Sequence, residues 1–149
     1  MPSPEPSPNA DHTSLPEDFW LGVQQFNQGS YYRCHDTLEA LWMAAPMVEK
    51  PFYQGILQIA VGLYHLQNHN WRGAAILLGE GSSRLLPFEP AYDQVDVSDF
   101  VDQAMAWLGA VQQAGPVQVE TMAAQLSAAV TDPSIKGDLP TPTLRRVSR

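Results

Sequence analysis

The sequence predicts an all-α fold, a compact bundle of five to six helices built from antiparallel helical hairpins. Three observations predict it. Apolar residues recur at three- and four-residue spacing, and no stretch alternates apolar and polar residues as a half-buried strand would. Prolines, glycines and capping residues interrupt the pattern at short intervals. The chain has 149 residues, 44% of them hydrophobic, which is enough for one domain with a buried core.

The first two helices are bounded by start and stop signals. A helix is expected over about residues 16–28, because proline and two acidic residues open this stretch and a glycine follows it. Ser30 can cap a second helix, over about residues 30–45, whose apolar side chains keep the three-four spacing. The two helices are therefore expected to form the first hairpin.

The next two helices form a second pair. Prolines bound the loop before a helix over about residues 51–67, which carries no charged residue and is apolar nearly all round. Such a helix is typical of the centre of a bundle, where neighbours cover several of its faces. Asn70 can cap a fourth helix over about residues 71–86, which Pro87 ends.

Two more helices and two flanking arms complete the predicted domain. A fifth helix opens at Asp96 or Ser98 and runs to about residue 114, and an Ala-rich sixth helix is expected over about 117–130. Proline-rich flanks with few large aliphatic residues are typical of disorder. The predicted organisation is a disordered arm over 1–14, one helical domain over 15–130 and a disordered tail over 131–149.

Charge and cysteine content exclude several classes of function. The net charge is −8, and up to Leu144 there are 16 acidic residues against 5 basic ones, a charge of −11. A body this acidic repels phosphate backbones and anionic lipid, so we expect neither a nucleic-acid partner nor a membrane partner. The single cysteine, Cys34, permits no intramolecular disulfide, and the first residues lack the pattern of a secretory signal. The cytoplasm is the expected location.

A polar stripe runs along the predicted central helix. Gln54, Gln58, Val61, His65 and His69 fall within a sector of roughly 80° when successive residues are placed 100° apart. Because the rest of this helix is apolar, we expect the stripe to lie inside the protein, where each polar group needs a partner.

The second helix offers such partners. His35 and Glu39 are four residues apart and share a face, with Tyr31 and Trp42 beside them. If the two faces meet, they form one pocket lined by the candidate residues Tyr31, His35, Glu39, Trp42, Gln54, Gln58 and His65.

Three interpretations of this pocket are open. In the first, Glu39 and the imidazoles form a buried hydrogen-bond network with a structural role. In the second, His35, Glu39 and His65 bind a divalent transition metal such as zinc, iron or nickel, with His69 or Glu80 as a fourth ligand. In the third, the pocket binds a small ligand or performs acid–base chemistry. The chain has no nucleophile motif or glycine-rich phosphate loop beside these residues, so the sequence leans against an enzyme.

Three sequence strings resemble a known family of small helical proteins. They are FNQGSYYRCHDTLEALW over 26–42, FYQGILQIA over 52–60 and NHNWRGAA over 68–75. Together they resemble the family named domain of unknown function 309, over about residues 19–86. The resemblance includes His35 and Glu39 and implies a helical bundle without an assigned activity. A Glu often follows the His in that family, whereas this chain has Asp36 there.

Two functions from different classes follow from these observations. The first is a non-enzymatic binding or scaffold module in the cytoplasm, acting on a protein partner or on a second copy of itself. It is favoured because ten of the fourteen aromatic residues fall between Phe19 and Trp71 without a reaction motif. The alternative is a metal- or small-ligand-binding protein, and possible metal-dependent enzyme, that uses His35, Glu39 and His65.

Overall fold

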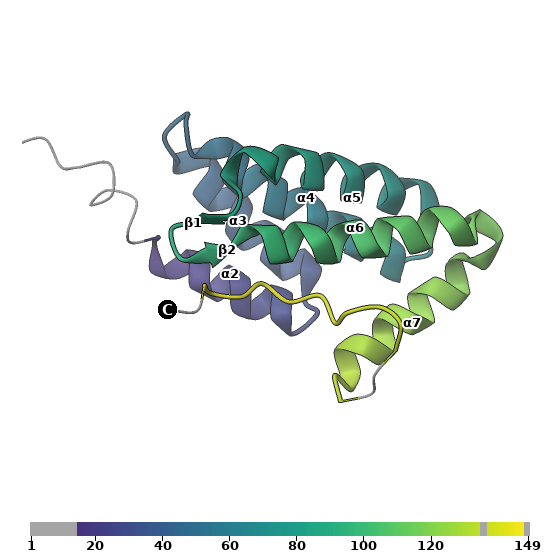
Figure 1. The fold of residues 1–149 in the computed structure, drawn as a ribbon. Helices are drawn as coiled ribbons and strands as arrows, with labels where there is room; N and C mark the ends of the chain where they lie inside the picture. Colours follow the sequence, from purple (N-terminus) through teal and green to yellow (C-terminus); the bar gives the residue numbers. More distant parts are fainter. Residues whose placement is uncertain (1–14, 135–136, 148–149) are drawn as a thin grey trace, which may run out of the picture.

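The structure is a computed structural model that describes residues 15–134 and 137–147. Six α-helices in this part of the chain pack as hairpins, and each lies within two residues of its predicted range, so the predicted all-α bundle is confirmed (Figure 1). The helices are α2 (Glu17–Asn27), α3 (Tyr31–Ala44), α4 (Lys50–Gln67), α5 (Trp71–Leu85), α6 (Val97–Ala114) and α7 (Val119–Thr131). Two 3-10 turns, η1 (Leu86–Phe88) and η2 (Pro116–Gln118), follow α5 and α6.

The central helix is α4, as its apolar composition predicts. It packs against α3, α5 and α7, and it contributes buried aromatic and aliphatic side chains to one continuous core. Its contact with α5 is close because both helices have glycine there. A Cβ atom on Gly81 would lie only 2.7 Å from the carbonyl oxygen of Gly55. The two backbones therefore meet at a distance that only glycine permits.

Helix starts agree with the predicted caps at two of three positions. The Asn70 side chain accepts a hydrogen bond from the backbone N–H of Gly73 at 2.9 Å, and the Asp96 side chain accepts one from Asp99 at 3.1 Å. Each bond satisfies a backbone donor that the first turn of a helix leaves free. The Ser30 side chain makes no such bond at the start of α3.

A short hairpin between η1 and α6 was not expected from the sequence. Strand β1 (Ala91–Tyr92) pairs antiparallel with β2 (Val95–Asp96). Strands of two residues are too short to show alternation, so periodicity could not predict them. The hairpin matters because it offers a strand edge to the C-terminal part of the chain.

The segment after α7 differs most from its prediction. The sequence predicts a disordered tail over 131–149, but the described residues 137–147 run back along α6 to the hairpin (Figure 1). Leu144 in this segment is 4% exposed and belongs to the core. The described part of this segment is held in place because side chains of distant helices bond its backbone, which composition cannot reveal. We call residues 140–147 the strap. The predicted arm over 1–14 lies outside the described residues.

No helix in the described part of the chain has both the length and the apolar character needed to cross a membrane.

Candidate functional site

Helix α3 has a buried face and an exposed face, and the candidate residues divide between them. Tyr31, Cys34 and Leu38 are at most 1% exposed and pack in the core. Burial raises the pKa of the Cys34 thiol to about 12 and, with a smaller contribution from Cys34, raises the pKa of the Tyr31 phenol above its usual range. Cys34 is therefore a neutral thiol in the fold. The Tyr31 hydroxyl has no hydrogen-bond partner among the described residues.

His35 lies on the exposed side of α3 and contacts two carboxylates. Its Nδ1 atom is 3.3 Å from Asp36 Oδ1, and its Nε2 atom is 3.1 Å from Glu39 Oε2. The Asp36 and Glu39 side chains are 63% and 50% exposed, so this group sits at the surface and not in an internal pocket. Both contacts can be hydrogen bonds only when the ring carries protons on both nitrogens.

The polar stripe of α4 faces α5 rather than α3, which makes the predicted meeting of the two faces wrong. Gln58 donates to Glu80 Oε2 at 3.3 Å and accepts from Arg84 Nε at 3.0 Å, and both partners belong to α5. Gln54 is half-buried on the same helix, and His69 is exposed just beyond its end. The stripe therefore forms part of the α4–α5 surface.

His65 is separated from His35 by two tyrosine rings. Its Nδ1 atom lies 3.3 Å from the Asn70 side-chain nitrogen, and its ring lies against Gly73 of α5. A row of ring contacts links the imidazoles: His35 to Tyr32 at 5.8 Å, Tyr32 to Tyr64 at 5.2 Å, and Tyr64 to His65 at 6.3 Å between centroids. The structure thus does not bring His65 to His35 and Glu39.

The described residues contain no group of three or more His, Cys, Asp or Glu side chains that could hold a metal ion. His35, Asp36 and Glu39 come nearest to forming such a group. Asp36 and Glu39 contact opposite nitrogens of the His35 ring, so the three side chains do not converge on one point. The trio His35, Glu39 and His65 is not assembled.

Trp42 lies at the end of α3, away from the pocket predicted for it. Lys50 Nζ sits 4.8 Å from the centroid of its ring and donates to the carbonyl oxygens of Trp42 at 2.8 Å and Met43 at 3.3 Å. The lysine thereby satisfies carbonyls that the last turn of a helix leaves free. The indole N–H of Trp42 is buried and has no partner among the described residues.

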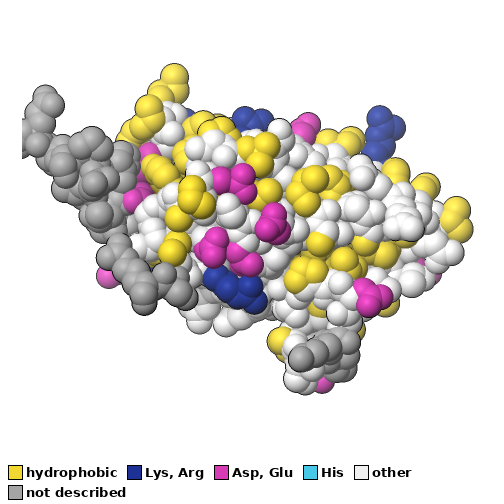
Figure 2. All heavy atoms as spheres, viewed as in Figure 1, with side chains coloured by type: hydrophobic (Ala, Val, Ile, Leu, Met, Phe, Trp, Pro, Cys, Tyr) yellow, Lys and Arg dark blue, Asp and Glu magenta, His cyan; other side chains and the backbone are white. Residues whose placement is uncertain are grey.

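Large apolar side chains are exposed along the outer side of α3 and the connection to α4. They are Tyr32 (55% exposed), Met43 (67%), Met47 (82%) and Val48 (72%). Together with the carboxylates of Asp36 and Glu39 they form what we call the α3 face. Figure 2 shows hydrophobic side chains at the connection between α3 and α4, which protrudes at the upper left of the view. Interactions with other molecules commonly use such exposed aromatic and methionine side chains.

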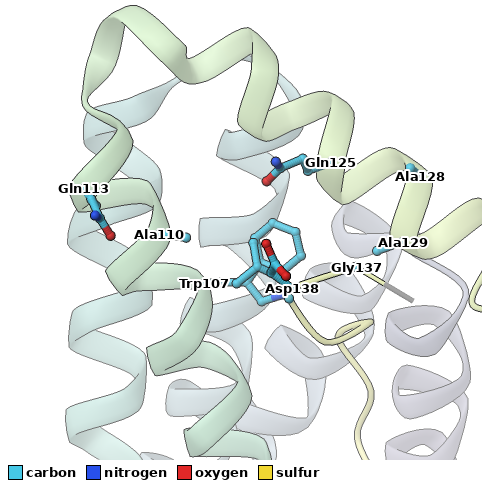
Figure 3. Close-up of a pocket in the computed structure, with 9 residues that line it drawn as sticks. Trp107, Ala110, Gln113, Gln125, Ala128, Ala129, Gly137 and Asp138 are labelled. Atoms are coloured by element: carbon cyan, nitrogen blue, oxygen red, sulfur yellow. The ribbon is translucent and has the colours of Figure 1, made fainter. Parts of the chain in front are cut away.

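A pocket of about 520 Å³ lies between α6 and α7. Its lining residues are Trp107, Ala110, Gln113, Gln125, Ala128, Ala129, Gly137, Asp138 and Leu139. Figure 3 shows Gln125 reaching from α7 toward Trp107 and Asp138, so two amides and a carboxylate border a floor of small and aromatic side chains. The sequence could not reveal this pocket, because its polar groups come from three separate segments. The one signal available was the weak amphipathicity of the Ala-rich helix α7.

These observations define a small all-helical protein with an exposed aromatic and methionine face. The family described as "Domain of unknown function (DUF309)" matches residues 19–77, which confirms the resemblance seen in the sequence. The matched part runs from α2 into α5 and includes α3 with its exposed face.

One relative is similar to part of the chain. The chain is 38% identical over 60 residues to the uncharacterized protein YpuF of Bacillus subtilis (strain 168), and the match covers 40% of this chain. It spans 34% of YpuF, about a third of that protein's length. No solved structure matches the chain. Neither the family description nor the name of the relative states an activity.

Proposed function

We propose that this protein is a non-enzymatic binding module whose docking surface is the α3 face. One observation carries the proposal: four of the ten large hydrophobic side chains that are exposed in the described part lie between Tyr32 and Val48. Exposure of such a cluster to water is unfavourable, and clustered exposed apolar groups commonly mark interaction sites.

The chemistry of the α3 face indicates what kind of partner fits it. Tyr32 and Met43 offer large, adaptable apolar contacts, and Asp36 and Glu39 place two exposed carboxylates between them along the helix. The complementary surface carries apolar side chains and basic groups. A protein partner or a second copy of this chain can supply such a surface. We place the module in the cytoplasm, because its one cysteine is a buried free thiol.

Affinity capture with matched variants tests the proposal. The full chain serves as bait in native extract, beside a Met43→Ser/Met47→Ser variant and a Met105→Ser control. Met105 is 50% exposed on α6, so its substitution changes apolar surface away from the α3 face. Truncation of interface anchors typically costs ~1–2 kcal/mol each, so the double variant should lose its partner while the control retains it.

Sedimentation velocity on the same three proteins tests self-association. If the partner is a second copy, wild type and the Met105 control sediment as the larger species and the double variant as the smaller one. Identical captured partners and identical sedimentation for all three proteins would reject the α3 face as a docking surface.

The pocket between α6 and α7 favours a second candidate function, small-molecule binding. Its volume of about 520 Å³ is in the range of small-ligand sites, and its apolar floor with few polar groups is typical of them. An Ala110→Leu variant should fill the pocket, whereas Ala106→Leu on the exposed side of α6 should leave it open. Compounds that raise the melting temperature of wild type should act on the Ala106 variant and not on the Ala110 variant. A screen with no active compound would argue against this candidate.

A further inference from the structure

Two side-chain amides hold the strap to the helices, and each bonds one strap residue twice. Asn27, at the end of α2, accepts from the backbone N–H of Leu144 at 2.8 Å and donates to its carbonyl at 3.2 Å. Gln103 of α6 accepts from the N–H of Thr143 at 2.8 Å and donates to its carbonyl at 2.9 Å. Paired bonds of this kind recognise an extended backbone whatever its side chains.

The strap inserts one large side chain between the helices. Leu144 is 4% exposed and packs in the core, and Pro142 is buried two residues earlier. Thr143 between them is half-buried, and residues 145–147 are exposed. This alternation is that of an extended segment lying in a groove, with a leucine as its main apolar anchor.

The two residues after Leu144 add charge recognition. Arg145 Nη1 lies 3.2 Å from Asp99 Oδ2, and the guanidinium of Arg146 lies 3.8 Å from the centroid of the Trp20 ring. The chain before these arginines carries a charge of −11, so it attracts basic segments generally. Figure 2 shows acidic side chains gathered beside basic ones on this face.

The end of the strap extends the β-hairpin. The backbone N–H of Asp96 donates to the Arg145 carbonyl at 2.9 Å, and the N–H of Val147 donates to the Gln94 carbonyl at 2.8 Å. Val95 and Arg146 form an antiparallel bridge. Addition of an extended segment to a strand edge is a recurrent way in which proteins bind peptides.

The receiving side of the groove is positioned by its own elements. Gln103 is 6% exposed, and its amide also donates to Asp99 Oδ2 at 2.7 Å, one turn earlier on α6. Asn27 is the last residue of α2. Gln103 is thus held by α6 as well as by the strap, and Asn27 belongs to a helix, whereas the strap has no helix of its own.

We infer that this groove between α2, α6 and the hairpin is a peptide-binding site for an extended segment carrying Leu followed by two basic residues. The strap is its tethered occupant, and a segment of a partner protein with the same chemistry displaces it. Tethering gives the strap a high effective concentration, so a peptide in solution binds the wild-type chain more weakly than a chain whose strap is weakened. The site goes beyond the proposed function and lies apart from the α3 face.

Fluorescence anisotropy with a labelled peptide of residues 139–147 tests this inference on the full chain. The receiving proteins are wild type and an Arg145→Glu/Arg146→Glu variant, which alters only exposed strap side chains and leaves the groove intact. A Leu144→Asp variant weakens the strap further. The peptide should bind the strap variants saturably. Its affinity for wild type should be lower by at least roughly tenfold.

Variants of the groove provide the specificity controls. Asn27→Ala in the strap-weakened chain should weaken peptide binding roughly tenfold, because two hydrogen bonds are lost. Met105→Ser, on the exposed side of α6, should leave binding unchanged, as should Met43→Ser on the α3 face. A peptide with Asp in place of Leu144 should not bind.

Three results would overturn the inference. The first is no peptide binding to the Arg145→Glu/Arg146→Glu chain while its circular dichroism matches wild type. The second is binding that Asn27→Ala does not change. The third is a wild-type dimer by sedimentation that Leu144→Asp abolishes, which would make a second copy the occupant. None of these results depends on the α3 face, so the failure of either proposal leaves the other standing.

Discussion

Substitution of Gly81 by alanine should destabilise the protein, although alanine is the better helix former. The added Cβ would lie 2.7 Å from the carbonyl oxygen of Gly55 and 3.0 Å from the backbone nitrogen of Ile59. Both atoms belong to the backbone of α4, so neither can rotate away and the helices must separate. Overpacking of this kind costs about 1–3 kcal/mol, and backbone contacts put this position at the upper end.

The net effect follows by difference. Alanine gains about 1 kcal/mol over glycine inside a helix, so Gly81→Ala should lower the free energy of unfolding by about 2 kcal/mol. The matched control is Gly109→Ala on α6, where nothing lies within 4 Å of the added Cβ. That variant should gain about 0.5–1 kcal/mol. For a chain of this length, the Gly81 variant should melt about 4–8 °C below wild type.

Urea unfolding followed by circular dichroism measures both variants. We expect a lower midpoint for Gly81→Ala and a higher one for Gly109→Ala, with the same dependence on urea. A Gly81 variant as stable as the Gly109 variant would refute the close contact between α4 and α5.

Three further predictions concern the helices of the matched family segment. The unfolded Cys34 thiol ionises near its ordinary pKa of 9.0, whereas the folded thiol, with a pKa of about 12, stays protonated. The free energy of unfolding should therefore decrease as the pH rises from about 9 toward 12. Equal urea midpoints at about pH 8 and about pH 10.5 would contradict this prediction. Asn70→Ala should cost about 1 kcal/mol, since the N–H of Gly73 loses its partner, and Asn70→Ser should restore most of it. Glu39→Ala should cost less than about 0.5 kcal/mol, because its contact with His35 is exposed; a loss above about 2 kcal/mol would mean that the pair is buried.

Most of the fold could be predicted from the sequence, because its helices are bounded by local signals. Asn70 and Asp96 act as caps through contacts three residues away, which a sequence displays directly. The strap could not be predicted for the opposite reason. Its order depends on Asn27, which is 117 residues from Leu144, and on Gln103, which is 40 residues from Thr143.

The candidate site was harder to predict than the fold. Helical periodicity shows which residues share a face, but not which neighbour covers that face. Gln58 was therefore placed correctly on a stripe with His65 but assigned to the wrong helix pair. On α3, His35 lies about 100° from Cys34 but only about 60° from Leu38, at the edge of the buried face, so periodicity alone does not decide whether it is buried.

Site-specific photo-crosslinking at Met47 tests the central claim most directly. Met47 is 82% exposed at the tip of the α3 face, and Met105 is 50% exposed on α6. A benzophenone amino acid is placed at either position in the full chain, and native extract is irradiated. We expect one discrete adduct from position 47, either with a partner or with a second copy, and none from position 105. Absence of an adduct at position 47, or the same adducts from both positions, would contradict a binding module that docks through the α3 face.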